Sequence, residues 1–419
     1  MSGEAITVMS ALVFCYALVS RRLTFANVTA PMLSIVAGMV VFSTGSVAIN
    51  ADFVHSIAEI TLVIILFHDA STVRLSQLRH DPGIAVRLLL VGFPLALLAT
   101  YLVARPLLPD LGWAGALVIA AAITPTDAGL GAPTVLNPTV PVRVRRGLNV
   151  ESGLNDGLAT PIVLVALGVL AEREDAPIPG LLGIGVVSVL LALVCSVLLA
   201  VVMAWAMDWS RRRQMSGRRG RQVAVLALPA LLFGAAELIG ANAFIAAFVG
   251  GLVFGAASKT LAEEHESADL LETSADLLGF PVWFLFGGLL LRVFQHGLRW
   301  QWLVIAVLAL TVLRMVPVAL AMLGSGLRPP TIAFLGWFGP RGLATIVFGL
   351  LALEELGSDS PFIADIAGPL SVTVLLSVFA HGFSAGPLSV SYGAWAERTH
   401  APIVVEPHVE PRSRGRTGV

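Results

Sequence analysis

The chain has 419 residues, of which 57% are hydrophobic and only 13% are charged. Soluble globular domains are about 25% charged, so this composition, with a mean hydropathy of +0.87, excludes an ordinary soluble domain and indicates a membrane protein with several spans. A formal net charge of −1, with the cations confined to short loops, gives no reason to expect a nucleic-acid partner. Cys15 and Cys195 lie in apolar runs without metal-ligand spacing.

The apolar runs follow one another along the whole chain. Because a membrane-spanning helix needs about 20 apolar residues, the sequence predicts about thirteen spans. In chain order they cover residues 4–20, 28–49, 54–71, 84–104, 112–136, 145–171, 180–207, 222–239, 241–257, 277–294, 301–324, 329–353 and 361–384. The predicted fold class is therefore an all-α polytopic membrane protein.

The charged loops predict how the chain lies in the membrane. Arg21 and Arg22 follow the first apolar run, and further cations cluster near residues 74–87, 143–146 and 211–221. Cytoplasmic loops hold the excess of Lys and Arg, so we expect a plasma or inner membrane protein with its N-terminus outside and its C-terminus in the cytoplasm. Anionic lipid headgroups are the expected neighbours of the basic 207–222 loop.

The spans are predicted to form a single transmembrane domain over residues 1–384, followed by a short cytoplasmic tail over 385–419. Six spans at about 4–171 and six at about 222–384 flank a linker helix at about 180–207, so the second repeat is inverted relative to the first. The fifth span is interrupted at ITPTDAG and the twelfth at GWFGPRG, where proline and glycine break the helix. Equivalent interrupted helices in inverted repeats predict a transport site near the membrane midplane.

Acidic residues lie inside segments that otherwise look membrane-spanning. A charge at such a depth costs about 2.5 to 3.5 kcal/mol on insertion scales, so an ion or proton site is the default interpretation. Thr126 and Asp127 in the first break offer the hard oxygen ligands that suit a small cation. Ser152 and Asp156 share one face of the next helix. We therefore expect Na⁺ or another monovalent cation to bind through Asp127, Asp156, Thr126 and Ser152.

Glu151 lies on a neighbouring stripe with Asn155 and is expected to point to a different side. An unpaired buried charge is strongly destabilising, so we predict a structural ion pair between Glu151 and Arg341, which lies in the second break. Arg314 is the other cation inside a predicted span. It is expected to bind carbonyls released at a kink near Pro317, or cytoplasmic lipid.

The motifs TPTDA, ESGLNDG and GPRG, with their spacing and about thirteen spans, resemble the monovalent cation:proton antiporter-1 family of bacterial sodium/proton antiporters and their eukaryotic exchanger relatives. AELIGANAFIAAFVGGLVFG and SVFAHGFSAGPL, around Glu237 and His381, are also similar to later helices of that family. The resemblance implies a homodimer in which a transport core moves against a fixed dimer-forming domain. It also implies that the four positions named above hold the cation and that Glu151 pairs with Arg341.

Two further expectations come from this resemblance. Asn155 before Asp156 matches an Asn-Asp pair that is associated with electroneutral exchange of one cation for one proton. LVIILFHDAST resembles a third-span pattern of the family, which makes Asp69 a supporting residue that either lines the cytoplasmic funnel or caps a helix near Arg74. His68 either tunes the pH response or is simply a solvated residue at the interface.

The expected function is secondary active exchange of a monovalent cation, Na⁺ first, for protons, with both competing for Asp156 and Asp127. Burial disfavours a charged carboxylate, so a buried acid holds a proton until a cation replaces it. Alternatives are a K⁺/H⁺ or broad-specificity antiporter, a cation channel, or an intramembrane aspartyl enzyme in which the two aspartates share a proton. The paired breaks favour alternating access, so we expect no enzyme and no cofactor beyond the transported ions.

Overall fold

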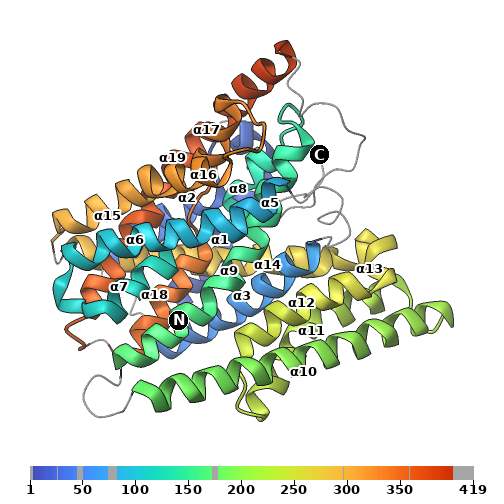
Figure 1. Cartoon of the computed structure of the whole chain (residues 1–419). Coiled ribbons are helices and arrows are strands. Elements are labelled where there is room, and N and C mark those ends of the chain that lie inside the picture. Colours follow the sequence, from blue (N-terminus) through green and yellow to red (C-terminus); the bar gives the residue numbers. More distant parts are fainter. Residues whose placement is uncertain are drawn as a thin grey trace.

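A computed structural model describes residues 3–25, 27–44, 51–73, 83–171, 178–295, 297–357 and 359–399. Over these ranges the regular structure is entirely helical (Figure 1). By length and hydropathy, nine segments of the described chain can cross a membrane, and two shorter apolar helices, Ala30–Ser43 and Ala243–Ala257, accompany them. The structure therefore confirms the predicted all-α polytopic class.

Each predicted span corresponds to one helix or to a run of two or three helical segments. The first six are α1 (Gly3–Phe25), α2 (Ala30–Ser43), α3 (Ala51–Thr72), the run of α5 (Gly83–Arg87), η1 (Leu88–Gly92) and α6 (Phe93–Leu107), the pair α7 (Gly112–Ile123) and α8 (Ala128–Val135), and α9 (Val142–Ala171). The linker position holds α10 (Ile178–Arg212). The later spans are α11 (Arg218–Leu238), α12 (Ala243–Ala257), α14 (Asp269–Gln295), the pairs α15 (Trp300–Leu310) with α16 (Val312–Ala321) and α17 (Pro329–Trp337) with α18 (Leu343–Leu356), and α19 (Ile363–Arg398). Short helices η2 (Pro109–Leu111), α13 (Lys259–Glu263) and η3 (His265–Ala268) connect them.

Two predicted boundaries differ from the structure. The last helix, α19, continues to Arg398 and buries Tyr392 and Ala396, so the expected start of the tail at 385 lies inside a packed helix. The charged 207–222 segment is mostly helix, because α10 runs to Arg212 and α11 begins at Arg218. The loop charges at 74, 79 and 172–175 and the tail from 400 lie outside the described residues.

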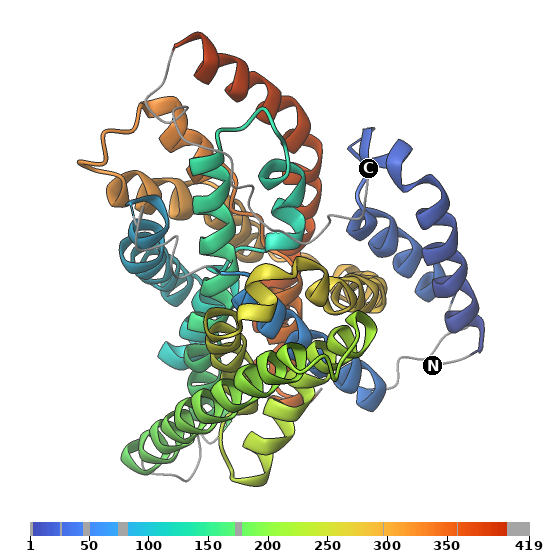
Figure 2. The ribbon, with the colours of Figure 1, turned by 90° about the vertical axis from the view of Figure 1, so that its right-hand side faces the viewer.

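The helices pack into two groups. A scaffold group contains α1, α2, α3, α10, α11, α12 and α14, and a crossing group contains α6 to α9 and α15 to α19. In Figure 2 the dark blue α1 and α2 lie on one flank and the green α10 runs along another edge. The groups meet where α3, α10 and α12 pack against α9 and where α14 packs against α18 and α19. The broken helices thus lie together in one group, beside a layer of mostly unbroken ones.

The glycines of α12 allow two scaffold helices to approach closely. A Cβ added at Gly251 would lie 2.5 Å from the carbonyl oxygen of Phe67 on α3, and one at Gly255 would meet the Ser71 carbonyl. Small residues make such a close contact between helices possible in membranes.

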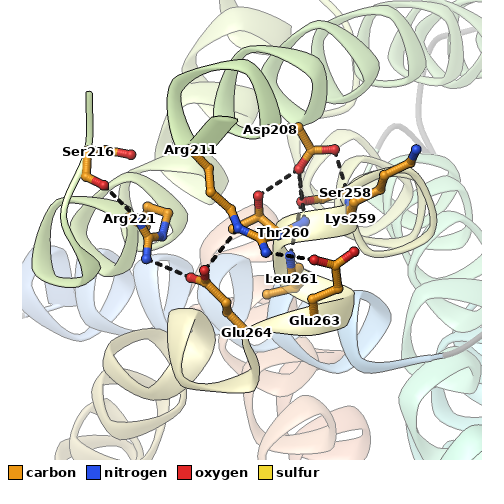
Figure 3. A network of polar contacts seen from close by, with 10 residues as sticks. All are labelled: Asp208, Arg211, Ser216, Arg221, Ser258, Lys259, Thr260, Leu261, Glu263 and Glu264. Carbon is orange, nitrogen blue, oxygen red and sulfur yellow. Dashed lines mark hydrogen bonds and ion pairs between the residues drawn. The ribbon is translucent and has the colours of Figure 1, made fainter. Parts of the chain in front are cut away.

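A polar network closes the turn between α10 and α11 onto α13 (Figure 3). The Asp208 carboxylate accepts hydrogen bonds from the backbone N–H of Thr260, at 2.9 Å, and from its hydroxyl, at 2.7 Å. Arg211 and Arg221 both contact Glu264, at 2.9 and 2.7 Å. These partly exposed pairs neutralise part of the basic run and join α10 and α11 to the end of α13.

Candidate functional site

The first helix break ends in an aspartate that starts a new helix. The break over residues 124–127 separates α7 from α8, and it contains Pro125, which has no backbone N–H. Asp127 has an extended backbone and is the N-cap of α8, where its Oδ1 accepts a 2.8 Å hydrogen bond from the N–H of Leu130. Aspartate is among the preferred N-cap residues because its carboxylate satisfies an otherwise unpaired donor.

The second break brings another helix N-terminus to the same carboxylate. The N–H of Leu343, the first residue of α18, donates to Asp127 Oδ2 at 2.7 Å, and the N–H of Asp127 donates to the Pro340 carbonyl at 2.7 Å. Both oxygens of Asp127 therefore face the positive ends of helix dipoles, those of α8 and α18. One carboxyl group at the crossing thus accepts hydrogen bonds from the first turns of both half-helices.

Gly342 permits this contact, and its substitution should break it. A Cβ at Gly342 would overlap the Asp127 carboxylate, whereas a Cβ at Gly349 on the same helix would only touch Leu370 Cδ2, at 3.5 Å. We expect Gly342→Ala to lower the apparent melting temperature of the purified protein and Gly349→Ala to leave it nearly unchanged. Equal melting of the two variants would show that the close approach at Asp127 contributes nothing.

A neutral oxygen cluster links the first break to α9. Thr126 Oγ1 lies 2.8 Å from Ser152 Oγ and accepts a 2.8 Å hydrogen bond from Asn155 Nδ2. Ser152 faces the break as predicted, but Asn155 does so as well, instead of following Glu151. Asp156 is buried on α9 four residues after Ser152. The structure thus brings Thr126, Asp127 and Ser152 together at the crossing and places Asp156 one helical turn from Ser152, and their role as cation ligands stays a prediction.

The buried ion pair of the site is Glu151 with Arg314, not Glu151 with Arg341. Arg314 Nη2 donates to Glu151 Oε2 at 2.8 Å, and Nη1 donates to Oε1. Both side chains are almost completely buried, at 2% and 1% exposure. This bidentate geometry suits the planar guanidinium group. The predicted pairing of Glu151 with Arg341 is therefore wrong, although Glu151 does have a buried arginine partner.

Arg341 instead binds main-chain carbonyls that the helix breaks release. Its Nε donates to the Ile123 carbonyl at the end of α7, at 2.9 Å, its Nη2 to the Ala309 carbonyl near the end of α15, at 3.1 Å, and its Nη1 to the Gly339 carbonyl. A cation at helix C-termini is favoured by the helix dipole. Arg341 is thus the positive counterpart of Asp127, which caps the N-termini.

Arg314 has the carboxylate partner that was predicted for Arg341, and it also contacts the Leu335 carbonyl near the end of α17, at 3.5 Å. The sequence marks both arginines as cations inside spans, and Arg314 was expected to bind the carbonyls of a kink or cytoplasmic lipid. A helix break does lie at Thr311, between α15 and α16, but the carbonyl of Ala309 just before it is bound by Arg341. Gly339 at the crossing packs against Arg314, since a Cβ there would lie 2.6 Å from Arg314 Nε. The direction of each long side chain follows from packing between helices distant in sequence, which no local pattern encodes.

The supporting residue Asp69 lies where the two helix groups meet. Its carboxylate Oδ1 is 3.0 Å from His68 Nδ1, and the two residues are only 6% and 2% exposed. A Cβ at Gly153 of α9 would lie 3.1 Å from the Asp69 carbonyl oxygen, so this end of α3 lies directly against the helix that carries Ser152 and Asp156. The interpretation of His68 as a solvated interfacial residue is wrong. Arg74, the expected partner of a capping Asp69, lies outside the described residues.

An all-helical membrane protein in which two interrupted helices cross beside buried carboxylates has the architecture of a secondary transporter. The sequence model of the transmembrane region of the sodium/hydrogen exchangers matches residues 8–391. The chain therefore belongs to the sodium/hydrogen exchanger family, as its motifs indicate.

Individual relatives agree with this assignment. A Na(+)/H(+) antiporter of Schizosaccharomyces pombe is 24% identical over 78% of this chain and 75% of its own length. Na(+)/H(+) antiporter 2 of Zygosaccharomyces rouxii is 27% identical over 60% of this chain, but the match spans only 33% of that longer protein. The fold is similar to that of the sodium proton antiporter MjNhaP1 from Methanocaldococcus jannaschii, with a TM-score of 0.71, 20% identity and coverage of 93% of this chain and 99% of that one.

Proposed function

We propose that this protein exchanges Na⁺ for protons across the cell membrane and that cation and proton compete for Asp156 and Asp127. The observation that carries the proposal is the crossing itself, where Asp127 accepts hydrogen bonds from the starts of α8 and α18 and Thr126 contacts Ser152 on α9, the helix that also carries the buried Asp156. Family membership and relatives named as Na(+)/H(+) antiporters support sodium as the cation.

The division of labour between the aspartates follows from their contacts. Asp127 is held in place by backbone N–H groups of α8 and α18, so it is a fixed part of the crossing. Asp156 lies on the continuous helix α9, beside the Thr126, Ser152 and Asn155 cluster. We assign Asp156 the exchange of cation for proton and Asp127 a ligand oxygen at a fixed position. A site that holds one ion or the other, and opens to each side in turn, couples the two fluxes.

The neighbour of Asp156 supports electroneutral exchange. Asn155 is a neutral amide whose Nδ2 donates to Thr126, so it adds no second titrating group beside Asp156. One carboxylate that releases one proton when it binds one monovalent cation moves no net charge. An imposed membrane potential should therefore leave the exchange rate unchanged.

Proteoliposomes that contain the purified protein and a pH-sensitive dye test the proposal directly. An inward Na⁺ gradient should drive protons out, and the same assay with Li⁺ and K⁺ decides between sodium-selective, K⁺/H⁺ and broad-specificity exchange. Cation flux without counterflow of protons would identify a channel and contradict antiport. A rate that follows the imposed potential would contradict electroneutrality alone.

Removal of one neutral ligand should weaken cation binding without abolishing exchange. Ser152→Ala deletes the hydroxyl that lies 2.8 Å from Thr126 Oγ1, and we expect the half-saturating Na⁺ concentration to rise by roughly ten-fold, the effect of losing about one hydrogen-bond-strength contact. Ser196→Ala, which removes a buried hydroxyl in the scaffold helix α10, is the matched control. An unchanged half-saturating concentration for Ser152→Ala would remove this residue from the site.

The remaining features of the proposal concern the membrane and the assembly. We propose an N-terminus outside, a cytoplasmic C-terminus, inverted repeats at about 4–171 and 222–384, and a homodimer in which the crossing group moves against the scaffold group. Large apolar side chains remain exposed on the scaffold helices α1 and α10, such as Phe14, Leu18, Leu198 and Trp205. Such a surface suits lipid or a second copy of the chain. Cross-linking between cysteines introduced on α1 or α10 in native membranes tests the dimer.

A further inference from the structure

Specific side chains cap the ends of the half-helices at the crossing. Asp127 accepts N–H groups from the starts of α8 and α18, and Arg341 binds carbonyls at the ends of α7 and α15. The end of α17, at Trp337, is met by a different residue. His381 on α19 lies there, almost completely buried at 2% exposure. The proposed exchange chemistry gives this histidine no part.

His381 contacts Trp337 in two ways. Its Nε2 lies 2.9 Å from the Trp337 carbonyl oxygen, and the two rings lie against each other with centroids 5.2 Å apart. A carbonyl oxygen can only accept, so Nε2 carries the proton in this contact. The last carbonyls of a helix have no partner within it. His381 therefore caps the C-terminus of α17 from a neighbouring helix.

One turn earlier on α19, Ser377 holds the other end of the break. The N–H of Arg341 donates to Ser377 Oγ at 2.6 Å, and that hydroxyl lies 3.2 Å from His381 Nδ1. A hydroxyl can accept one hydrogen bond and donate another at the same time, so Ser377 Oγ can also donate a hydrogen bond to Nδ1. Nδ1 also lies 3.0 Å from the Ser377 carbonyl of the same helix, so a doubly protonated ring would donate within α19 through Nδ1 and still donate to α17 through Nε2. The link between the helices thus exists in either protonation state.

These contacts fix both ends of a five-residue connection that ends at the ion site. The break covers residues 338–342, and α19 binds the residue before it, Trp337, and a residue near its end, Arg341. Leu343, two residues after Arg341, supplies the N–H that holds Asp127 Oδ2. Both links to α19 therefore lie on the stretch of chain that leads directly to that donor.

We infer that His381 is a positioning residue of the exchange site, which with Ser377 fixes the second break and so places the α18 N-terminus against Asp127. The inference rests on the proposed role of Asp127 as a cation ligand. A ligand set must be held within about 0.5 Å of its productive geometry by the residues around it. Loss of the His381 donor should therefore weaken cation binding more than it slows the maximal rate.

Two amide variants separate the donor from the bulk of the ring. In His381→Gln the amide nitrogen can occupy the position of Nε2 and still donate to the Trp337 carbonyl, whereas in His381→Asn the shorter side chain cannot reach it. The full-length variants are compared in proteoliposomes for the half-saturating Na⁺ concentration and the maximal rate. Hydrogen–deuterium exchange of peptides that cover residues 338–345 measures how firmly α19 holds the second break, without any transport. We expect His381→Asn to raise the half-saturating concentration by roughly ten-fold and to speed deuterium uptake, and His381→Gln to stay near the native protein.

Several results would overturn the inference. Unchanged half-saturating Na⁺ and unchanged deuterium uptake in His381→Asn would show that the break is fixed without this residue. Equal defects in both amide variants would show that the ring packs but does not position. If neither variant folds, Ser377→Ala removes the Arg341 link with a smaller change, and native behaviour there would equally contradict the inference. Failure of the native protein to couple Na⁺ to protons would instead contradict the proposed function. The deuterium measurement would still test whether His381 holds the second break.

Discussion

Asp156→Asn should abolish sodium-driven proton movement in proteoliposomes while the protein keeps its fold. The substitution keeps the shape of the side chain but removes the only group at that position that can exchange a proton for a cation. Asp156 is 6% exposed and lies on α9, one turn after Ser152. Because a buried charge in a membrane is costly in itself, its replacement by a neutral amide should leave the melting temperature equal or slightly higher.

The same substitution elsewhere provides the control for this prediction. Asp110 is exposed in the short helix η2 between α6 and α7, away from the crossing, and Asp110→Asn should exchange at the native rate. Measurable coupled exchange by Asp156→Asn would contradict the assignment of Asp156. Loss of exchange accompanied by a large fall in melting temperature would show instead that the carboxylate supports the fold.

Removal of either member of the Glu151–Arg314 pair should strongly destabilise the protein. Arg314→Ala leaves the Glu151 carboxylate buried without its bidentate partner, and breaking a buried pair in this way costs about 3 to 5 kcal/mol. Glu151→Ala leaves Arg314 in the corresponding state. Because the penalty comes mainly from the remaining charge, the double variant Glu151→Leu with Arg314→Met should recover much of the loss, since apolar replacements of buried pairs are often tolerated.

A double-mutant cycle on thermal stability decides which arginine is the partner. The coupling between Glu151 and Arg314 should be large, and the coupling between Glu151 and Arg341 should be small, because Arg341 donates to carbonyls instead. Arg218→Ala is the control, since its pairs with Glu266 and Asp269 are more than half exposed and such pairs contribute about 0 to 1 kcal/mol. A larger coupling of Glu151 to Arg341 would restore the pairing predicted from the sequence.

The contacts of Asp127 show why part of the site could not be derived from the sequence. The proline and glycine of ITPTDAG and GWFGPRG correctly predicted both breaks, because these residues disrupt a helix locally wherever they lie. The hydrogen bond from the Leu343 N–H to Asp127 joins residues 216 positions apart. A cap supplied by a different helix leaves no trace in the local pattern, so the aspartate was expected to bind the cation but not to start two helices.

The buried histidines illustrate the same limit. His68 and His381 lie near the ends of predicted spans, where hydropathy alone favours a solvated or packing role. In the structure His68 contacts Asp69 where α3 meets α9, and His381 bridges α19 to the end of α17. The presence of a histidine inside a predicted span was the available signal for a specific role. Its partner could not be derived, because the position of the side chain or main-chain carbonyl that it contacts depends on how the helices pack.

The sequence by itself determined the membrane class, the order and approximate extent of the helices, the two breaks, and the placement of Asp127, Glu151 and Asp156 within predicted spans. Each of these depends on composition, segment length or residues that act locally on the backbone. Only the tertiary structure decided that Arg314 rather than Arg341 meets Glu151, and that α18 and α19 complete the crossing. An arginine side chain is long and rotates about several bonds, so its partner is chosen by the helices packed around it and not by its place in the chain.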